Sequence, residues 1–409
     1  MGTQRRKRTF NGNTENQQSI PWDVPQNVSQ KHFRIVLMAT GAFAVPSMRL
    51  LCEEKSFDIV CLVTNPLRYD RHGNPIMTPA REFAAQYNIA VSDKDDIHSQ
   101  EFFDFLYLVR PDLLFVCDFG HILPKAVLKG SLLGGINLHG SLLPKYRGAA
   151  PVHWAILNGE QYTGVSIIHV TPKVDAGPVI AQSPPIRIGT RENTAALEER
   201  LADYGAELVY DVVNRMAGSR TVKIIEQLHE KASKAPKLKK ENGQIPWHKT
   251  AAEIFNHCRA MDPWPRSFTD WQRPDGSKLR LIIGQLVPLT DEFEEEIGGE
   301  FRSGILVAPV LMDAKMDNLA ELLSEQEDSS RKEQQQTSVP ESSSAHTLQT
   351  HALPEHNPGT ILCAESAKLI VAAKDGAVRI LFIQPVGKKM MPVKDFLQGY
   401  AVKQGDRLC

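Results

Sequence analysis

Short apolar runs alternate with amphipathic stretches through the first half of the chain. The apolar runs are continuous and rich in β-branched residues, which is typical of strands buried on both faces of a sheet. They lie at 33–39, 57–64 and 112–117. The stretches between them repeat apolar residues at helical spacing, at 43–54, 78–87 and 97–109. Because strands that alternate with helices form βαβ units, we predict a Rossmann-like, mostly parallel sheet.

The second half of the chain has a different pattern. Residues 192–218 repeat apolar positions at helical spacing and end at Gly218, which predicts a long helix that closes the first domain. A further helical piece, 251–261, is followed by short strand-like runs. These runs lie at 266–271, 279–287, 368–373 and 377–383. A set of short strands predicts a small β-barrel, so the expected fold is α/β followed by a smaller β domain.

Three segments lack the composition of a packed core. Residues 1–30 begin MGTQRRKR and contain no apolar segment, which indicates a disordered basic extension and excludes a secretory signal. A low-complexity insertion at about 291–357 interrupts the barrel pattern. The linker 219–243 is basic. The predicted order is the extension 1–30, a first domain 31–218, the linker 219–243 and a C-terminal domain 244–409 that carries the insertion.

Charge is distributed unevenly along the chain. The net charge is −1, which does not favour a strongly basic nucleic-acid binder. Residues 220–240, however, hold seven basic and two acidic side chains, a local net charge of +5. A basic linker beside a folded domain can follow a phosphate backbone, and a solvated surface connector is the alternative that charge alone leaves open.

Composition also limits the location and the chemistry of the protein. No apolar run approaches the roughly 18–20 residues that a membrane helix needs. The six cysteines form no CxxC pair, so we interpret them as reduced thiols of a cytoplasmic protein that builds neither a disulfide framework nor a zinc site. No GxGxxG follows the first strand, which argues against a nicotinamide cofactor.

Polar residues of three kinds follow strand-like runs between positions 135 and 180. Asn137 and His139 lie where the run GINL ends, and Asp175 follows the run VSIIHV. We expect two adjacent strand ends to bring His139 and Asp175 together. An amide and an imidazolium stabilise an oxyanion, while a carboxylate orients the imidazole and accepts protons, so this set suits acyl transfer to a nucleophile that the substrate supplies. A single histidine of this kind is more often structural, and the residues alone leave that reading open.

A longer stretch changes this balance. The sequences NLHGSLLPKYRGAAPVHWAILNG, TGVSIIHV and VDAGPVI resemble the signature region of the 10-formyltetrahydrofolate-dependent formyltransferases, in particular those that act on methionyl-tRNA. The similarity extends from about Phe33 to the C-terminus through GHILPKAVL, PWPRSF, PGTIL and QPVGKKMM. The resemblance implies a formyltransferase fold, an OB-like C-terminal barrel, and transfer of the formyl group of 10-formyltetrahydrofolate to the α-amino group of methionyl-initiator tRNA.

The resemblance also assigns roles to residues. It implies that Asn137, His139 and Asp175 are catalytic and that no metal is required. It implies contacts with the folate cofactor by Ser141, Leu142, Leu143 and Pro144, and by Asp118, Phe119 and Gly120. The expected tRNA contacts are Arg68 and Arg71 in the loop 65–75, Arg147 in the cleft wall, Lys237, Lys239 and Lys240 in the linker, and Lys388 and Lys389 in QPVGKKMM. Gly148 is expected to let the backbone approach a ligand.

Two stretches depart from the family pattern. ATGAFA at 39–44 stands where GTPDFA is usual, and Asp118-Phe119 stands where a small residue and Tyr are usual. The alternatives to the proposed activity are a related formyltransferase acting on an amino sugar or glycinamide ribonucleotide, and a folate- or RNA-binding module without turnover. We expect charged initiator tRNA and folate as partners, and a monomer.

Overall fold

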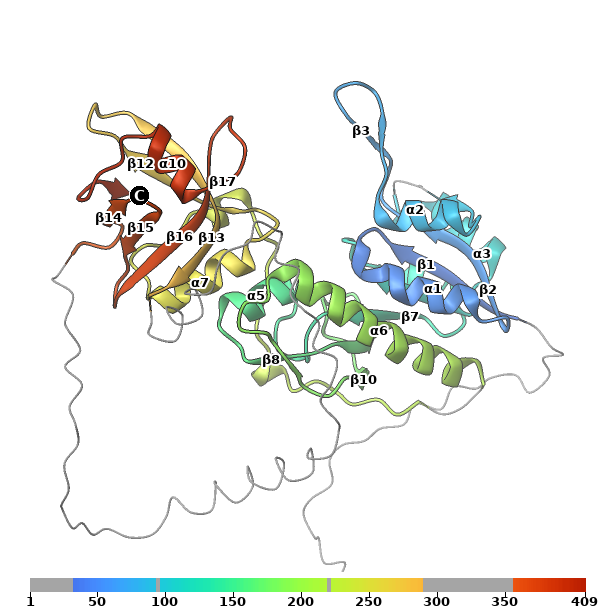
Figure 1. The fold of residues 1–409 in the computed structure, drawn as a ribbon. Coiled ribbons are helices and arrows are strands. Elements are labelled where there is room, and N and C mark those ends of the chain that lie inside the picture. Colours follow the sequence, from blue (N-terminus) through green and yellow to red (C-terminus); the bar gives the residue numbers. More distant parts are fainter. Residues whose placement is uncertain (1–31, 93–95, 219–221, 290–355) are drawn as a thin grey trace, which may run out of the picture. The chain divides into compact units, whose positions relative to one another are not determined.

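The computed structural model describes residues 32–92, 96–218, 222–289 and 356–409 (Figure 1). The predictions for the extension 1–30 and for nearly all of the insertion 291–357 lie outside the described residues. Within the described residues, no helix is both long enough and apolar enough to cross a bilayer.

A seven-stranded sheet in the order β10-β9-β7-β6-β1-β2-β5 forms the first part of the fold. Its strands are β1 Phe33–Ala39, β2 Phe57–Val63, β5 Val91–Ser92, β6 Leu113–Cys117, β7 Gly135–His139, β9 Ser166–His169 and β10 Val179–Gln182. Strands β5, β2, β1, β6 and β7 run parallel, whereas β9 and β10 are antiparallel to their neighbours. The prediction of a mostly parallel α/β sheet is therefore confirmed.

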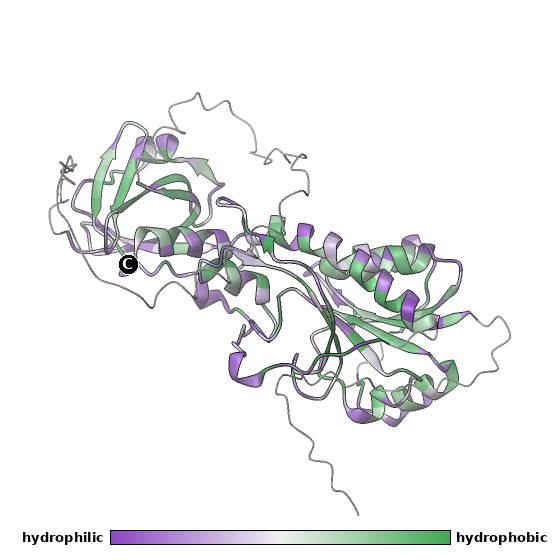
Figure 2. Cartoon of the chain, turned by 90° about the horizontal axis from the view of Figure 1, so that it is seen from below, coloured by the Kyte–Doolittle hydropathy of each residue, from purple (hydrophilic) through white to green (hydrophobic). Residues whose placement is uncertain are grey.

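Helices cover both faces of this sheet and turn their hydrophobic sides towards it (Figure 2). They are the 3-10 turn η1 Ala42–Ala44 and the helices α1 Val45–Glu53, α2 Pro79–Gln86, α3 Gln100–Val109, α4 Lys125–Leu128, α5 Pro151–Leu157 and α6 Thr194–Ala217. Asn193 caps α6 by accepting a hydrogen bond from the Ala196 N–H, and Ser99 caps α3 in the same way. The strands β8 Tyr162–Thr163 and β11 Ile186–Arg187 pair with each other in a separate two-stranded sheet. In the chain, β8 precedes β9 and β11 follows β10.

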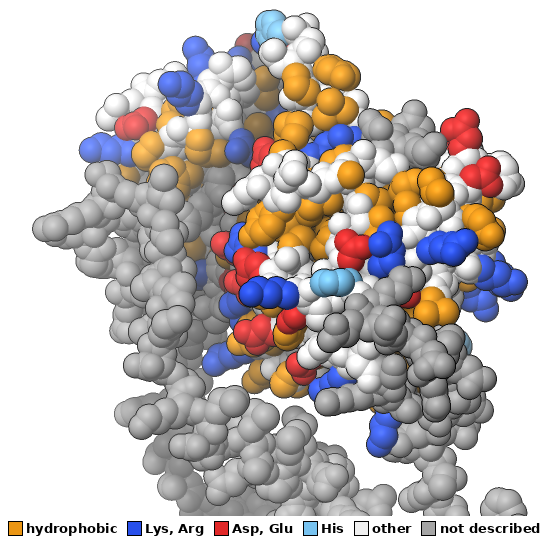
Figure 3. Space-filling view, turned by 90° about the vertical axis from the view of Figure 1, so that its right-hand side faces the viewer, with side chains coloured by type: hydrophobic (Ala, Val, Ile, Leu, Met, Phe, Trp, Pro, Cys, Tyr) orange, Lys and Arg blue, Asp and Glu red, His pale blue; other side chains and the backbone are white. Residues whose placement is uncertain are grey.

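The loop 65–75 forms a small hairpin of β3 Arg68–Tyr69 and β4 Pro75–Ile76. Asp70 stabilises its turn, because its carboxylate accepts hydrogen bonds from the backbone N–H groups of His72 and Asn74. Tyr69 and Ile76 are 63% and 50% exposed. Hydrophobic side chains lie at the top of the face in Figure 3, where this hairpin projects in Figure 1. The hairpin therefore presents apolar and basic side chains together.

The second sheet is antiparallel and has the order β14-β15-β16-β13-β12-β18, with β17 paired to β16. Its strands are β12 Ser267–Gln272, β13 Lys278–Pro288, β14 Ile361–Glu365, β15 Lys368–Ala372, β16 Ala377–Pro385, β17 Met391–Pro392 and β18 Arg407–Leu408. A bridge between Thr360 and Arg407 joins the two ends of this order, so the sheet nearly closes into a barrel. Helices α7 Ala251–Ala260 and α10 Val393–Gly399 accompany it. The predicted small barrel is confirmed, with β14, β17 and β18 added.

The linker follows the surface of the first domain instead of crossing solvent. It contains the 3-10 turns η2 His229–Lys231 and η3 Lys240–Gly243. Ala235 and Leu238 are buried in the same apolar cluster as the core of the first sheet. Backbone bridges pair Arg147 with Lys234 and Val179 with Ile225. Charge alone left open a solvated connector, but the described part of the linker is packed and hydrogen-bonded.

Candidate active site

A cavity of about 420 Å³ opens beyond the carboxyl ends of β6 and β7. Asn137 and His139 line it from β7, and Asp118, Phe119 and Gly120 line it from the segment that follows β6. Asp175 lines it from the loop between β9 and β10. The structure thus brings the predicted catalytic set together with the predicted Asp118 to Gly120 segment. The volume is within the range of roughly 300–1,000 Å³ that small-molecule sites occupy.

The route by which Asp175 reaches this cavity differs from the expected one. We expected two adjacent strand ends to meet, but β9 is antiparallel to β7, and Ile136 is paired with His169. The carboxyl end of β9 therefore lies at the opposite edge from His139. Asp175 reaches His139 because the loop after β9 folds back along the sheet. Gly177 permits this turn, since a Cβ at that position would overlap the carbonyl oxygen of His169.

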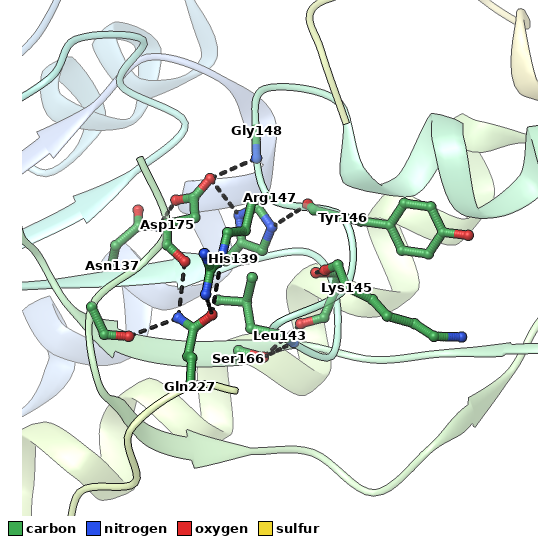
Figure 4. Close-up of polar contacts among 12 residues, drawn as sticks. Asn137, His139, Leu143, Lys145, Tyr146, Arg147, Gly148, Ser166, Asp175 and Gln227 are labelled. Atoms are coloured by element: carbon green, nitrogen blue, oxygen red, sulfur yellow. Dashed lines mark hydrogen bonds and ion pairs between the residues drawn. The ribbon is translucent and has the colours of Figure 1, made fainter. Parts of the chain in front are cut away.

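Asp175 contacts both other members of the set (Figure 4). Its Oδ2 lies 3.6 Å from His139 Nδ1, and its Oδ1 accepts a hydrogen bond of 3.5 Å from Asn137 Nδ2. Oδ2 also accepts a hydrogen bond of 2.8 Å from the Gly148 N–H. The side chains of His139 and Asp175 are only 6% and 15% exposed, so bulk water screens their interaction little.

The hydrogen bond on the other side of the imidazole determines which His139 nitrogen is available to a substrate. His139 Nε2 lies 2.9 Å from the carbonyl oxygen of Tyr146. A carbonyl only accepts, so Nε2 carries the hydrogen. Nδ1 is then the nitrogen that faces Asp175, and it carries a hydrogen when the imidazole is charged. A protonated Nδ1 beside a carboxylate is the form that can donate to a developing oxyanion.

Gln227 of the linker lies against this site, and our sequence reasoning did not identify it. Its Nε2 donates to the carbonyl oxygens of Asp175 and Gly177, at 2.9 and 2.7 Å. Its Oε1 accepts from Arg147 Nε and Nη2, at 3.0 and 2.5 Å. We interpreted the linker only by its charge, and an uncharged glutamine among seven basic residues gave no signal of a structural partner.

Arg147 and Gly148 were predicted to form a positive wall that contacts substrate. The Arg147 guanidinium instead contacts Gln227 and His229 Nδ1, the latter at 3.1 Å. A Cβ at Gly148 would overlap the carbonyl oxygen of Ala235. The linker therefore approaches the Gly148 backbone, and a side chain at this position would displace it. Gly148 also lines the cavity, and its expected role in letting the backbone approach a ligand stays a prediction.

The two departures from the family pattern contact each other. A Cβ added at Gly41 would overlap Asp118 Oδ2, so glycine at 41 provides the space that the Asp118 carboxylate occupies. Asp118 itself has a left-handed backbone, with φ of 49°. Desolvation by the cavity walls raises the pKa of Asp118 to about 6.

A second carboxylate with a raised pKa lines the same cavity. Desolvation, together with the charge of Asp118, raises the pKa of Glu198 on α6 to about 7. Glu198 Oε1 also lies 3.7 Å from His153 Nδ1. The cavity therefore holds two carboxylates besides Asp175, and sequence reasoning did not identify Glu198 as part of it.

The segment Ser141 to Pro144 does not line the cavity. Ser141 Oγ donates to the carbonyl oxygen of Lys145, and the Leu143 N–H donates to Ser166 Oγ, so these residues stabilise their own loop. Gln182 Nε2 donates to the Leu143 carbonyl oxygen. Their predicted folate contacts, which include Leu142, stay predictions.

The remaining predicted tRNA contacts are exposed basic side chains. They are Arg68 and Arg71 in and beside the β3–β4 hairpin, Lys237, Lys239 and Lys240 in the linker, and Lys388 and Lys389 after β16. Within the described residues, no group of three or more His, Cys, Asp or Glu side chains is arranged to hold a metal ion. Burial raises the pKa of both Cys61 and Cys258 to about 12, which makes these thiols unreactive at neutral pH.

Comparison with known proteins defines the class. Residues 33–213 match the formyl transferase family model, and residues 237–309 and 328–401 match that of the formyl transferase C-terminal domain. The chain belongs to the formyltransferase family. Its relatives include the methionyl-tRNA formyltransferase of Bacillus subtilis, 30% identical over 92% of this chain and 97% of the relative. The methionyl-tRNA formyltransferase of Rhodopirellula baltica is 40% identical over 58% of this chain and 73% of the relative.

Solved structures agree with the fold. The N-formyltransferase of Helicobacter canadensis in complex with folinic acid and dTDP-3-aminofucose has a TM-score of 0.53, with 15% identity over 87% of this chain and 100% of that chain. The sugar 3N-formyl transferase WlaRD has a TM-score of 0.52, with 16% identity over 88% of this chain and 100% of that chain. At these identities the similarity establishes the shared fold alone.

Proposed function

We propose that the protein transfers the formyl group of 10-formyltetrahydrofolate to the α-amino group of methionyl-initiator tRNA. The observation that carries this proposal is the convergence of Asn137, His139 and Asp175 on one cavity, in a chain whose 30% identical relatives over nearly full length are methionyl-tRNA formyltransferases. The family uses 10-formyltetrahydrofolate as its formyl donor, and the cavity has the volume and mixed lining for such a small molecule.

The nucleophile in this reaction is the amine of the substrate. An α-amino group has a pKa near 7.7–8.0, so a useful fraction is uncharged at neutral pH. The amine nitrogen forms a bond to the formyl carbon, and the carbonyl electron pair moves onto oxygen. Asn137 Nδ2 and the charged His139, through Nδ1, donate to that oxygen. This stabilisation applies to the tetrahedral state, where the charge develops, and therefore lowers the barrier.

Asp175 has two roles in this mechanism. Its carboxylate lies 3.6 Å from His139 Nδ1 and orients the imidazole. It also accepts the proton that the attacking nitrogen loses. When the tetrahedral state breaks down, the bond between the formyl carbon and the folate nitrogen breaks, and that nitrogen takes up the proton that Asp175 accepted, which returns Asp175 to its carboxylate form. No metal is required for these steps.

We propose that the exposed basic residues on the hairpin, linker and barrel contact the phosphates of the tRNA. Arg68, Arg71, Lys239 and Lys388 are exposed, which allows their charges to neutralise phosphates. Arg147 is engaged by Gln227 and His229, so its contact with tRNA requires a change of partner. We further propose that the protein acts as a monomer in the cytoplasm, and that residues 31–218 are its catalytic domain.

One assay tests the activity and its substrate. The purified protein is incubated with 10-formyltetrahydrofolate and, separately, methionyl-initiator tRNA, methionyl-elongator tRNA, amino sugars and glycinamide ribonucleotide. We expect formylation of the initiator tRNA at a kcat/KM at least about 100-fold above every other acceptor, a difference of about 2.7 kcal/mol in transition-state binding. Formylation of an amino sugar or the nucleotide in place of the tRNA would overturn the proposal, and so would folate binding without turnover.

A further inference from the structure

The backbone of Asp175 is held in an unfavourable conformation. Its φ is 46°, in the left-handed region that residues with a side chain seldom adopt. Such a conformation persists where the surroundings fix it. Here the Gly148 N–H holds the Asp175 carboxylate and Gln227 Nε2 holds the Asp175 carbonyl oxygen. Asp175 is therefore fixed at both its side chain and its backbone.

Gln227 can make these contacts in one orientation only. Its side chain amide is buried, with the whole residue 6% exposed. The NH₂ group faces two carbonyl oxygens, of Asp175 and Gly177, and the oxygen faces two N–H groups of Arg147. A rotated amide would place donors against donors and acceptors against acceptors. Both the nitrogen and the oxygen of this amide are therefore hydrogen-bonded. An apolar side chain at this position would leave the carbonyl oxygens of Asp175 and Gly177 and the guanidinium of Arg147 without these hydrogen bonds.

The backbone on both sides of Gln227 is fixed as well. Before it, Ile225 and Val179 exchange two backbone hydrogen bonds of 2.8 Å each. After it, the Ser233 carbonyl oxygen accepts from the Arg147 N–H, and Ser233 Oγ accepts from the Tyr146 N–H. Tyr146 is the residue whose carbonyl oxygen holds His139. The linker thus connects the loop that carries Asp175 to the loop that orients His139 (Figure 4).

From this arrangement we propose that Gln227 is a positioning residue for the reaction, which holds the Asp175 loop so that the carboxylate faces His139. The linker around it is then part of the active site, although it touches no reacting atom. This inference rests on the proposed formyl transfer for its kinetic test. It concerns the geometry of Asp175, so it also has a structural test that does not depend on activity.

Substitution of Gln227 separates positioning from general stability. Gln227→Leu keeps the volume and removes all four hydrogen bonds. We expect kcat for formylation to fall about 100-fold, because a misplacement of about 1 Å has that effect, while KM for the formyl donor changes less than about threefold.

Gln227→Glu provides a second, pH-dependent readout. Its carboxylate still accepts from Arg147 but places a negative oxygen against the carbonyls of Asp175 and Gly177. Once protonated, the carboxyl donates one hydrogen bond and restores part of the contact. We therefore expect the ratio of variant to wild-type kcat to rise as the pH falls. A ratio independent of pH would contradict the proposed donor role.

Thr194→Val is the matched control. Thr194 is buried, and its Oγ1 donates to the carbonyl oxygen of Ala260 at 2.9 Å, outside the cavity. This variant loses a comparable buried donor, and we expect wild-type kcat and pH profile at reduced thermal stability. A Gln227→Leu protein that behaves like Thr194→Val would overturn the inference. If the wild-type protein transfers no formyl group, the proposed function is overturned instead. A crystal structure of Gln227→Leu then tests the positioning inference without any assay of activity. If Asp175 Oδ2 still contacts the Gly148 N–H in that structure, the inference is refuted.

Discussion

Of the three residues proposed to be catalytic, Asp175 is the one that contacts both others, His139 and Asn137. Asp175→Asn keeps the shape and the acceptor oxygen but removes the negative charge. We expect kcat to fall about 100- to 1,000-fold, the usual cost of losing one stabilising group of an oxyanion site, with little change in folate binding. Single-turnover formylation and a separate folate titration measure the two effects. Wild-type turnover in this variant would end the assignment of Asp175.

Asp118 makes stability depend on pH. Its folded-state pKa of about 6 lies above the ordinary value of 3.8, so the folded protein binds this proton more tightly than the unfolded chain. The resulting stability is complete below pH 3.8 and is lost as the pH rises through about 6. Asp118→Asn removes this loss. We therefore expect a higher free energy of unfolding than wild type at pH 8 and no gain near pH 4, measured by urea denaturation.

A control with the opposite sign is available in the barrel. Hydrogen bonds from Ser277 hold the pKa of Asp275 below its usual range. Asp275→Asn should consequently lower stability at pH 8, with the difference disappearing as the pH falls below the ordinary value. If Asp118→Asn and Asp275→Asn shift stability in the same direction at pH 8, the desolvation of the Asp118 carboxylate is not the cause of its effect.

The residues of the site were predictable only in part. Asn137, His139 and Asp175 could be chosen because each follows a strand-like run and belongs to a long specific motif. Gln227 and Glu198 could not, since a glutamine in a basic linker and a glutamate on an amphipathic helix are ordinary at such positions. Both residues come close to the cavity through tertiary contacts, which no local sequence pattern encodes. Gln227, for example, contacts Asp175 from 52 positions away in the sequence.

At the scale of elements, the strands and helices of the first domain follow the hydrophobic pattern closely, but the direction of β9 does not. A buried strand of four residues such as β9 has the same composition whether it runs parallel or antiparallel to its neighbour. The path of the chain between β7 and β9, through α5 and β8, brings β9 in antiparallel to β7. The expected meeting of strand ends was wrong for this reason, although His139 and Asp175 do meet.

The β3–β4 hairpin offers a test of tRNA contact by a single element. Arg68 and Arg71 are exposed, with Tyr69 between them 63% exposed. If each arginine neutralises one phosphate, replacement by Ala should weaken tRNA binding and reduce the slope of log K against log salt by about 1 for each. The measurement is tRNA affinity across salt concentrations, with kcat at saturating tRNA unchanged.

Arg110→Ala is the control for this experiment. Arg110 follows α3 and precedes β6, so it lies at the amino-end edge of the sheet, opposite the cavity. It is also exposed, and its removal changes the net charge by the same amount. An equal change of slope in Arg110→Ala would show that the hairpin makes no specific phosphate contact.

At the scale of the whole molecule, the predicted division into an α/β part and a small barrel agrees with the two sheets, because each has its own periodicity of apolar residues. The packed linker was not predictable, since its buried apolar residues, which include Val222, Ile224, Ala235 and Leu238, are few and dispersed among charged residues. The linker packs on the α/β part and precedes the barrel in the chain. The segment proposed to contact tRNA phosphates also contains the residue proposed to position Asp175.

The closure of the barrel leads to a last prediction, for the chain between β13 and β14. In the order β14-β15-β16-β13, residues Ile361, Val371, Val378 and Pro288 follow one another across the sheet. Three steps of about 4.8 Å separate Pro288 from Ile361, about 14 Å in all, which five or six extended residues span. Residues 291–355 are therefore not needed to connect the strands. Replacing them with an eight-residue Gly/Ser linker should leave the melting temperature within about 3 °C, because loop-closure entropy changes slowly with length. Calorimetry measures the melting temperature. The rate at which the shortened protein formylates initiator tRNA should stay within about threefold of wild type. A larger loss of rate at an unchanged melting temperature would contradict the prediction and would give the replaced segment a part in tRNA binding.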